Sequence, residues 1–234
     1  MRKPKFTPLQ IATHIAAWIP LVWLLWDAFT NNLTINPIQA ATQRTGKYAL
    51  VMLVLSLACT PLNTVFGFRQ ALQVRRALGL YAFGYAAIHF SIFIGLDYGF
   101  NWALLLAEIV EKRYVLVGLG ALLILLTLAI TSFKWWMKRL GKNWKRLHRL
   151  VYLAGGLVIL HYAWAAKGDI LRLQGDIWQP LAFGAVVALL LVARIPGVRK
   201  AISARRLRPG RSGRTGVKQR GLPGRKEARK ISEQ

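Results

Sequence analysis

Four histidines are the residues of this chain best suited to do chemistry in an apolar environment: His14, His89, His148 and His161. The stretch 143–165, NWKRLHRLVYLAGGLVILHYAWA, holds two of them, one at its basic entry and one deep in an apolar run. Imidazole is a metal ligand and a proton carrier near neutral pH. Because lipid solvates ionisable groups poorly, a histidine inside a membrane span is a functional candidate, and a neutral ring bonded to a neighbouring helix is the structural alternative.

Six apolar stretches of about 17–25 residues without charged side chains must position these histidines. Each is long enough to cross a hydrocarbon layer of about 30 Å as a helix that satisfies its own backbone hydrogen bonds. The sequence therefore predicts an all-α integral membrane protein, a six-helix transmembrane bundle. A further apolar segment, 101–110, is too short to cross and is expected at the interface. The predicted spans are 9–26, 48–66, 77–96, 114–133, 150–166 and 177–193.

His89 and His161 lie at matching depth on two different predicted helices. His89 comes 12 residues into the third span and His161 comes 11 residues into the fifth. At about 1.5 Å per residue, these depths are roughly 18 and 17 Å on two helices that run in the same direction. Two such imidazoles can clamp one b-type haem between helices through its two axial positions. The spacing predicts His89 and His161 as axial ligands of a haem iron.

Glycines precede both of these histidines. They are Gly79 and Gly84 before His89, and Gly155 and Gly156 before His161. A residue without a side chain lets a flat macrocycle or another helix approach closely, and ordinary helix packing is the alternative explanation.

The other two histidines lie near the opposite end of the predicted spans. His148 precedes His161 by 13 residues, which is about 20 Å along a helix, so the two cannot share a site. The residue 13 positions before His89 is Arg76, so the third span offers His148 no histidine partner. His148 could be the ligand of an irregular second metal site, a polar contact for a bound quinone or flavin, or an interfacial residue. His14 is expected to pack structurally, although it is the one histidine that could meet His148.

Charge sets the expected orientation. With the N-terminus in the cytoplasm, 27 of the 33 basic residues lie on the cytoplasmic side, and six of the eight acidic residues lie on the other side. Both termini are then cytoplasmic. The expected organisation is a cytoplasmic N-terminus (1–8), a membrane domain (9–195) and a basic, disordered tail (196–234) attracted to anionic lipid. Long uncharged runs exclude a nucleic-acid-binding protein, and the single Cys59 excludes an intramolecular disulfide.

Three segments resemble a known family. They are THIAAWIPL at 13–21, RRALGLYAFGYAAIHF at 75–90 and LGKNWKRLHRLVYLAGGLVILHYAWAAK at 140–167. The chain resembles the MsrQ (YedZ) family of haem-binding membrane subunits of the periplasmic protein-methionine-sulfoxide reductase system. This family belongs to the ferric-reductase-like transmembrane superfamily. The resemblance covers residues 9–195 and leaves out the basic tail.

The resemblance implies an electron-transfer subunit of the bacterial inner membrane, with b-type haem, FMN and a role for quinone. Electrons would come from quinol or a cytoplasmic flavin reductase and pass to a periplasmic molybdopterin-containing, MsrP-like catalytic subunit. The family histidines correspond to His89, His148 and His161. No catalytic residue for methionine sulfoxide is expected in this chain.

Two other functions fit the sequence less well. The first is the membrane domain of a ferric reductase or superoxide-producing oxidase. That enzyme would need a separate flavin reductase, because no dinucleotide-binding glycine motif follows a strand pattern here. The second is a non-redox transporter or assembly factor, although the internal repeats and paired broken helices of many transporters are not evident.

Overall fold

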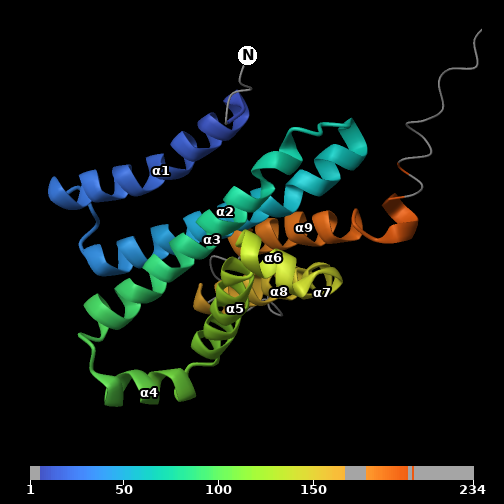
Figure 1. Ribbon diagram of the computed structural model, residues 1–234. Helices are drawn as coiled ribbons and strands as arrows, with labels where there is room; N and C mark the ends of the chain where they lie inside the picture. Colours follow the sequence, from blue (N-terminus) through green and yellow to red (C-terminus); the bar gives the residue numbers. More distant parts are fainter. Residues whose placement is uncertain (1–5, 167–177, 200–201, 203–234) are drawn as a thin grey trace, which may run out of the picture.

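A computed structural model describes residues 6–166, 178–199 and 202, and this part of the chain is built of helices (Figure 1). Each of the six predicted spans corresponds to one of these helices. The elements, in order, are α1 (Pro8–Phe29), α2 (Pro37–Phe66), α3 (Ala71–Ile92), a π-helical turn (Phe93–Asp97), α4 (Trp102–Glu111), α5 (Arg113–Ile130), α6 (Lys134–Leu140), α7 (Lys142–Leu147), α8 (Leu150–Ala165) and α9 (Trp178–Val192).

Local signals explain where the first two helices begin. Thr7 caps α1 by accepting a hydrogen bond from the Gln10 backbone N–H, and the Gln10 side chain accepts one from the Thr7 N–H. Asn36 caps α2, and Pro37 supplies the first helical position, where no backbone N–H is needed. Helix α2 therefore starts 11 residues before the predicted span. The predicted span begins at residue 48 because residues 37–47 include the charged side chains of Arg44 and Lys47.

Among the described residues, four helical segments are long and apolar enough to cross a membrane: α1, α2, α3 with the π-helical turn, and α5. Helices α8 and α9 have 16 and 15 residues and are shorter than a usual span. The predicted interfacial segment forms α4, whose 10 residues are too few to cross. The predicted tail lies outside the described residues, apart from residues 196–199 and 202.

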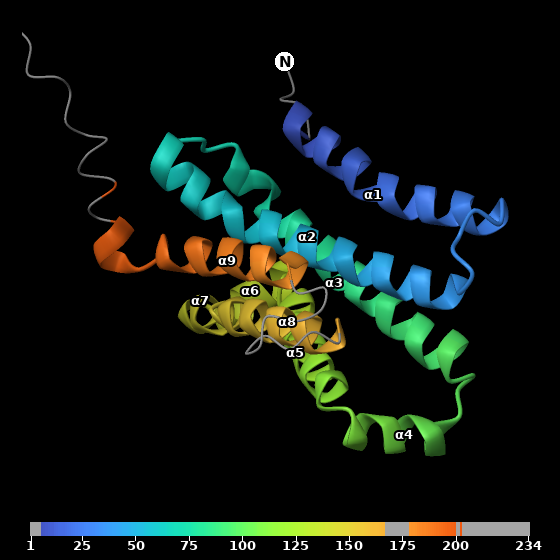
Figure 2. The same ribbon diagram turned by 180° about the vertical axis from the view of Figure 1, so that it is seen from behind.

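Helices α2 and α3 form an antiparallel pair through the middle of the molecule, with α1 along one side of it (Figures 1 and 2). Helix α5 packs mainly on α8, and α9 contacts both α8 and α2. The core lies where these helices meet, and its side chains include Leu53, Leu57, Ala82 and Ala154.

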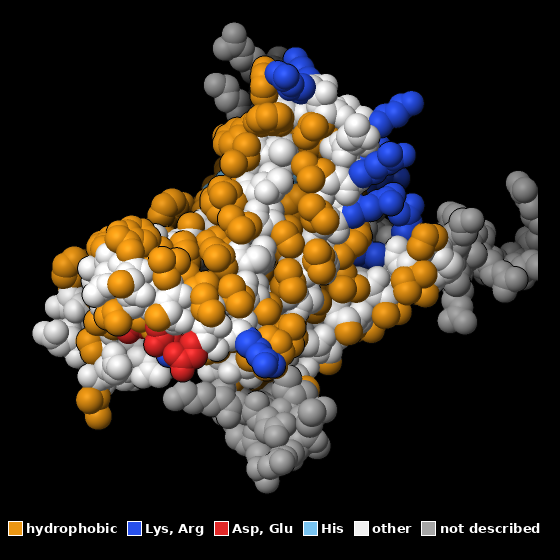
Figure 3. Space-filling view, turned by 90° about the horizontal axis from the view of Figure 1, so that it is seen from below, with side chains coloured by type: hydrophobic (Ala, Val, Ile, Leu, Met, Phe, Trp, Pro, Cys, Tyr) orange, Lys and Arg blue, Asp and Glu red, His pale blue; other side chains and the backbone are white. Residues whose placement is uncertain are grey.

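The outer surface of the helices is apolar. Large side chains such as Trp18, Trp23 and Trp26 are more than half exposed. Figure 3 shows hydrophobic side chains over much of one face, with Lys and Arg side chains gathered along one edge. Exposed apolar area on this scale marks a surface that meets lipid or another protein.

A proline inside α2 explains an unusual contact of Arg194. Pro61 has no N–H, so the carbonyl of Leu57, four residues earlier, lacks its usual partner within the helix. The Arg194 side chain, just beyond α9, donates a hydrogen bond of 2.5 Å from Nη2 to that carbonyl oxygen. Arg194 thus satisfies the backbone at the proline and ties the end of α9 to α2.

This contact predicts a coupled pair of substitutions. Arg194→Met should lower the free energy of unfolding by about 1–3 kcal/mol, because the Leu57 carbonyl loses its donor in an apolar setting. In a Pro61→Ala background the same substitution should cost much less, since the residue 61 N–H can then bond to Leu57. A double-mutant cycle of unfolding in detergent micelles measures the coupling. An equal cost in both backgrounds would contradict this explanation.

Candidate functional site

The imidazole rings of His89 and His161 face each other between α3 and α8. Their ring centroids are 6.1 Å apart and their planes are nearly perpendicular, at 86°. The two residues are 72 positions apart in the sequence. The structure therefore brings together the two histidines that were predicted to share a site.

Each ring is held by a backbone carbonyl of a neighbouring helix. His89 Nδ1 lies 2.8 Å from the carbonyl oxygen of Thr42 in α2. His161 Nδ1 lies 2.7 Å from the carbonyl oxygen of Tyr114 in α5. A carbonyl only accepts hydrogen bonds, so each ring must carry its proton on Nδ1, and each neutral ring then keeps its Nε2 lone pair available.

This arrangement suits two axial ligands of one metal. With imidazole–metal bonds of about 2 Å on each side, two rings that share a metal have centroids about 6 Å apart. A second ring nitrogen that donates to a carbonyl is the usual outer partner of a metal-bound histidine, because it fixes the tautomer and raises the basicity of the ligand. Within the described residues there is no group of three or more His, Cys, Asp or Glu side chains around a metal-sized space. A haem iron needs only two protein ligands, so the pair fits a haem.

Sequence reasoning missed two glycines next to these rings. A Cβ atom on Gly46 would lie 3.1 Å from the His89 ring, and a Cβ atom on Gly118 would lie 2.6 Å from His161 Nδ1. One regularity of the sequence could have indicated these glycines. Thr42 precedes His89 by 47 residues and Tyr114 precedes His161 by 47 residues, and a glycine follows Thr42 and Tyr114 four residues later.

The four glycines named in the sequence analysis (Gly79, Gly84, Gly155 and Gly156) do not lie against the histidine rings. A Cβ on Gly79 would contact the Ser56 hydroxyl, and one on Gly155 would contact Leu57 and Val187. These two positions serve helix packing. Gly84 and Gly156 have no heavy atom within 4 Å of such a Cβ, so open space lies beside both.

His148 lies away from the pair, between α7 and α8. Its ring stacks on Trp144 at a centroid distance of 4.0 Å, and its nitrogens approach the Trp144 carbonyl at 3.2 Å and the Ser132 hydroxyl at 3.5 Å. Burial lowers the pKa of His148, and the charges of Arg75 and Arg76 act in the same direction. The hydrogen bond to the Trp144 carbonyl acts in the opposite direction on this pKa. All four histidines are described, and none of the other three rings contacts His148, so this part of the chain offers it no partner for a bis-histidine site.

His14 contacts α3 and not His148. Its Nδ1 lies 2.9 Å from the Tyr81 hydroxyl, and its ring packs edge-on against Tyr81 and Phe6. The expected packing role fits these contacts. His14 consequently serves as a control residue for the pair.

Two arginines meet at one turn of α2. Arg75 Nη1 donates to the Thr60 hydroxyl at 3.4 Å, while Arg194 bonds to Leu57 one turn earlier. The ion pairs within the described residues are Arg44 with Asp27 and Lys112 with Glu108, so neither of these arginines has an acidic partner in this part of the chain. Arg194 Nε is buried there without a hydrogen-bond acceptor.

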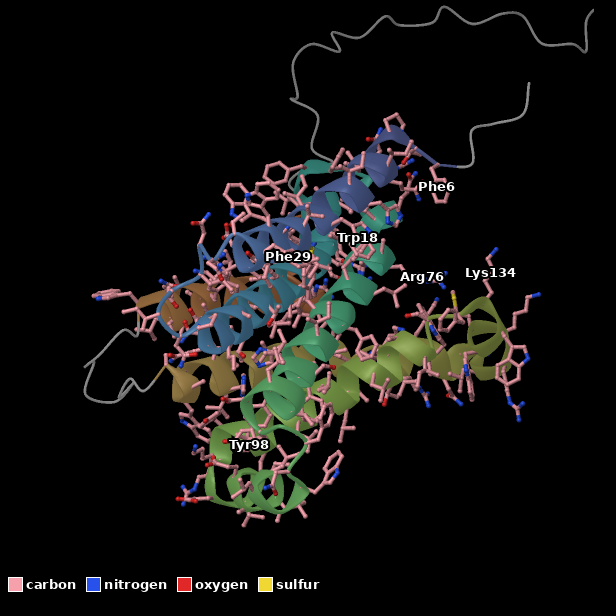
Figure 4. The ribbon with its side chains drawn as sticks, turned by 90° about the vertical axis from the view of Figure 1, so that its left-hand side faces the viewer. Phe6, Trp18, Phe29, Arg76, Tyr98 and Lys134 are labelled. Atoms are coloured by element: carbon pink, nitrogen blue, oxygen red, sulfur yellow. The ribbon has the colours of Figure 1, made fainter. Side chains whose placement is uncertain are left out.

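Arg76 and Tyr98 mark the two ends of the segment formed by α3 and the π-helical turn. In Figure 4, Arg76, Lys134 and Phe6 lie toward one side, and Tyr98, just beyond the π-helical turn, lies toward the other. His89 is near the C-terminal end of α3 and is only nine residues before Tyr98. The histidine pair thus lies toward the end opposite Arg76.

The fold and the site define a class: all-helical membrane proteins with two facing histidines on different helices. Residues 45–160 match the family model of the ferric reductase like transmembrane component. The chain belongs to the MsrQ family. It is 41% identical to the protein-methionine-sulfoxide reductase heme-binding subunit MsrQ of Rhodospirillum rubrum, over 84% of this chain and 92% of that protein. It is 39% identical to proteins of the same name from Herminiimonas arsenicoxydans, over 82% of this chain and 86% of that one, and Deinococcus radiodurans, over 90% and 98%.

Proposed function

We propose that this chain is the electron-transfer subunit of a methionine-sulfoxide reductase system and holds one b-type haem between His89 and His161. The observation that carries the proposal is the pair of rings 6.1 Å apart, each with its Nδ1 bonded to a carbonyl. Relatives that are 39–41% identical are named heme-binding subunits of such a system, which supports the same role here. Bound haem supplies one-electron transfer.

The residues around the pair have defined tasks in this proposal. His89 and His161 bind the group through Nε2, while the Thr42 and Tyr114 carbonyls keep each proton on Nδ1. Both rings are part-buried next to these neighbouring helices. Low polarity around the bound group is one of the factors that set its reduction potential.

We further propose six membrane crossings with both termini in the cytoplasm of a bacterial inner-membrane protein. The uneven distribution of basic residues supports this orientation. Helix α8 is about 24 Å long at 1.5 Å per residue, so it would need a locally thinner bilayer or help from flanking residues. In this orientation the histidine pair lies in the outer half of the membrane, close to a periplasmic acceptor.

On the donor side, Arg75 and Arg194 support a cytoplasmic site for FMN. Two guanidinium groups that have no acidic partner among the described residues can bind a phosphate through charge-assisted hydrogen bonds. Quinol or a cytoplasmic flavin reductase would deliver the electrons. The distal partner would be a periplasmic, molybdopterin-containing, MsrP-like subunit.

Arg75→Gln should weaken FMN retention at least about 10-fold, because a charge-assisted hydrogen bond contributes about 1.5–3 kcal/mol. The measurement is the FMN content of purified protein after a standard wash, with haem content as an internal reference. Arg69→Gln, at an exposed position in the turn just before α3, is the matched control. Equal FMN loss in both variants, or none in either, would show that Arg75 does not bind FMN.

The haem proposal is tested by the visible spectrum and the haem-to-protein ratio of the purified chain. We expect a Soret band of six-coordinate, low-spin iron and about one haem per chain, since one histidine pair is present. A protein that is correctly folded yet takes up no haem would refute the proposal. A ratio near two would indicate a further site, for which His148 is the first candidate.

A further inference from the structure

The two histidine rings are seated on their neighbouring helices in the same way. Each ring packs against a glycine, Gly46 in α2 or Gly118 in α5, and points its Nδ1 at the carbonyl four residues earlier. In an α-helix, residues four apart lie on the same face, one turn from each other. The carbonyl and the bare Cα therefore form one small seat that holds an imidazole edge.

The seat at Gly118 leaves no room for a side chain, and the seat at Gly46 leaves little. A Cβ on Gly118 would lie 2.6 Å from His161 Nδ1 and 2.8 Å from its Cε1. Carbon does not approach ring atoms this closely, and the ring cannot retreat without losing its 2.7 Å contact with Tyr114. A Cβ on Gly46 would lie 3.1 Å from His89 Cε1 and Nδ1, which is tight but can be relieved by a small shift.

We propose that Gly46 and Gly118 are positioning residues that set the plane of each axial imidazole. The carbonyl fixes the direction in which Nδ1 points, and the glycine fixes how close and how flat the ring lies on the helix. Together the two seats hold the ring planes at 86° to each other. The inference rests on the proposed haem ligation, but it concerns the orientation of the ligands and not whether they bind.

Another glycine provides a matched control. Gly120 lies on the same helix as Gly118 and would not place a Cβ within 4 Å of another group. Alanine at Gly46, Gly118 and Gly120 makes the same chemical change and raises helix propensity equally. Differences between the variants then report on the seats alone.

The test compares haem content and the electron paramagnetic resonance spectrum of the oxidised protein. The largest g value of low-spin haem falls as two axial ligand planes turn from perpendicular toward parallel. We expect Gly118→Ala to shift this g value and to weaken haem binding about 10–100-fold, as the loss of an outer partner of a metal ligand does. Gly46→Ala should shift it less, and Gly120→Ala should match the parent protein. Unchanged g values in both seat variants would overturn the proposal.

A second experiment separates positioning from general damage to the fold. In a His161→Gly background, free imidazole can replace the missing ligand without being tethered to α8. Adding Gly118→Ala to this background should not weaken haem binding any further, because an untethered ring can adopt a new tilt. If Gly118→Ala still weakens haem binding in this background, Gly118 acts through another contact and the inference fails. Absence of haem from the parent protein would instead refute the proposed function.

Discussion

His89→Ala and His161→Ala should each abolish the low-spin haem spectrum. Each substitution removes one of the two facing rings, 6.1 Å apart, and no other histidine ring contacts either of them. Replacing an outer partner of a metal ligand typically costs 10–100-fold in affinity, so removal of the ligand itself should cost at least about 100-fold. The measurement is haem retained per protein after purification, together with the Soret spectrum of whatever remains.

His14→Ala is the matched control, because His14 also lies within an apolar helix but bonds to Tyr81. This variant should keep the parent spectrum. His148→Ala should also keep the signal of the pair, since its ring contacts are with Trp144. A normal Soret band in His89→Ala or His161→Ala would show that the two rings do not ligate the haem.

We expect no reduction of methionine sulfoxide by this chain alone. Reduction should be seen only when a soluble catalytic subunit is also present. Its single thiol, Cys59, is 3% exposed and donates a hydrogen bond to the Leu55 carbonyl at 3.2 Å. A buried thiol in apolar surroundings is not available as a nucleophile for an oxidised protein. We therefore expect the reduced haem to be reoxidised at least about 100-fold faster when the subunit and sulfoxide are both present, which corresponds to about 2.7 kcal/mol in activation free energy.

Stopped-flow spectroscopy of the prereduced protein measures this reaction. Omission of either the subunit or the sulfoxide is the control, and His161→Ala protein should be inactive in the full mixture. Sulfoxide reduction by the membrane chain alone would contradict the prediction. Fast reoxidation by ferric chelates or oxygen, without any response to the subunit, would favour the ferric reductase or oxidase alternative.

Local rules were enough to predict much of this architecture. A run of apolar residues without charge identifies a helix in lipid because every backbone group must be bonded within the segment. Each of the six predicted spans overlaps a helix of the described residues, although α2 begins 11 residues before its predicted span, where Asn36 and Pro37 start the helix. The number of membrane crossings and their direction stay predictions from length and charge.

The spacing of residues along the chain also predicts similar depths for His89 and His161, because the rise per residue of a helix is nearly constant. That the rings face each other is visible only in the folded molecule, since the rotation of a helix about its axis depends on which neighbours it packs against. The same holds for the seats at Gly46 and Gly118 and for the bond from Arg194 to Leu57, which join residues 43 to 137 positions apart. Contacts of that range depend on how whole helices pack, and no local pattern of residues specifies them.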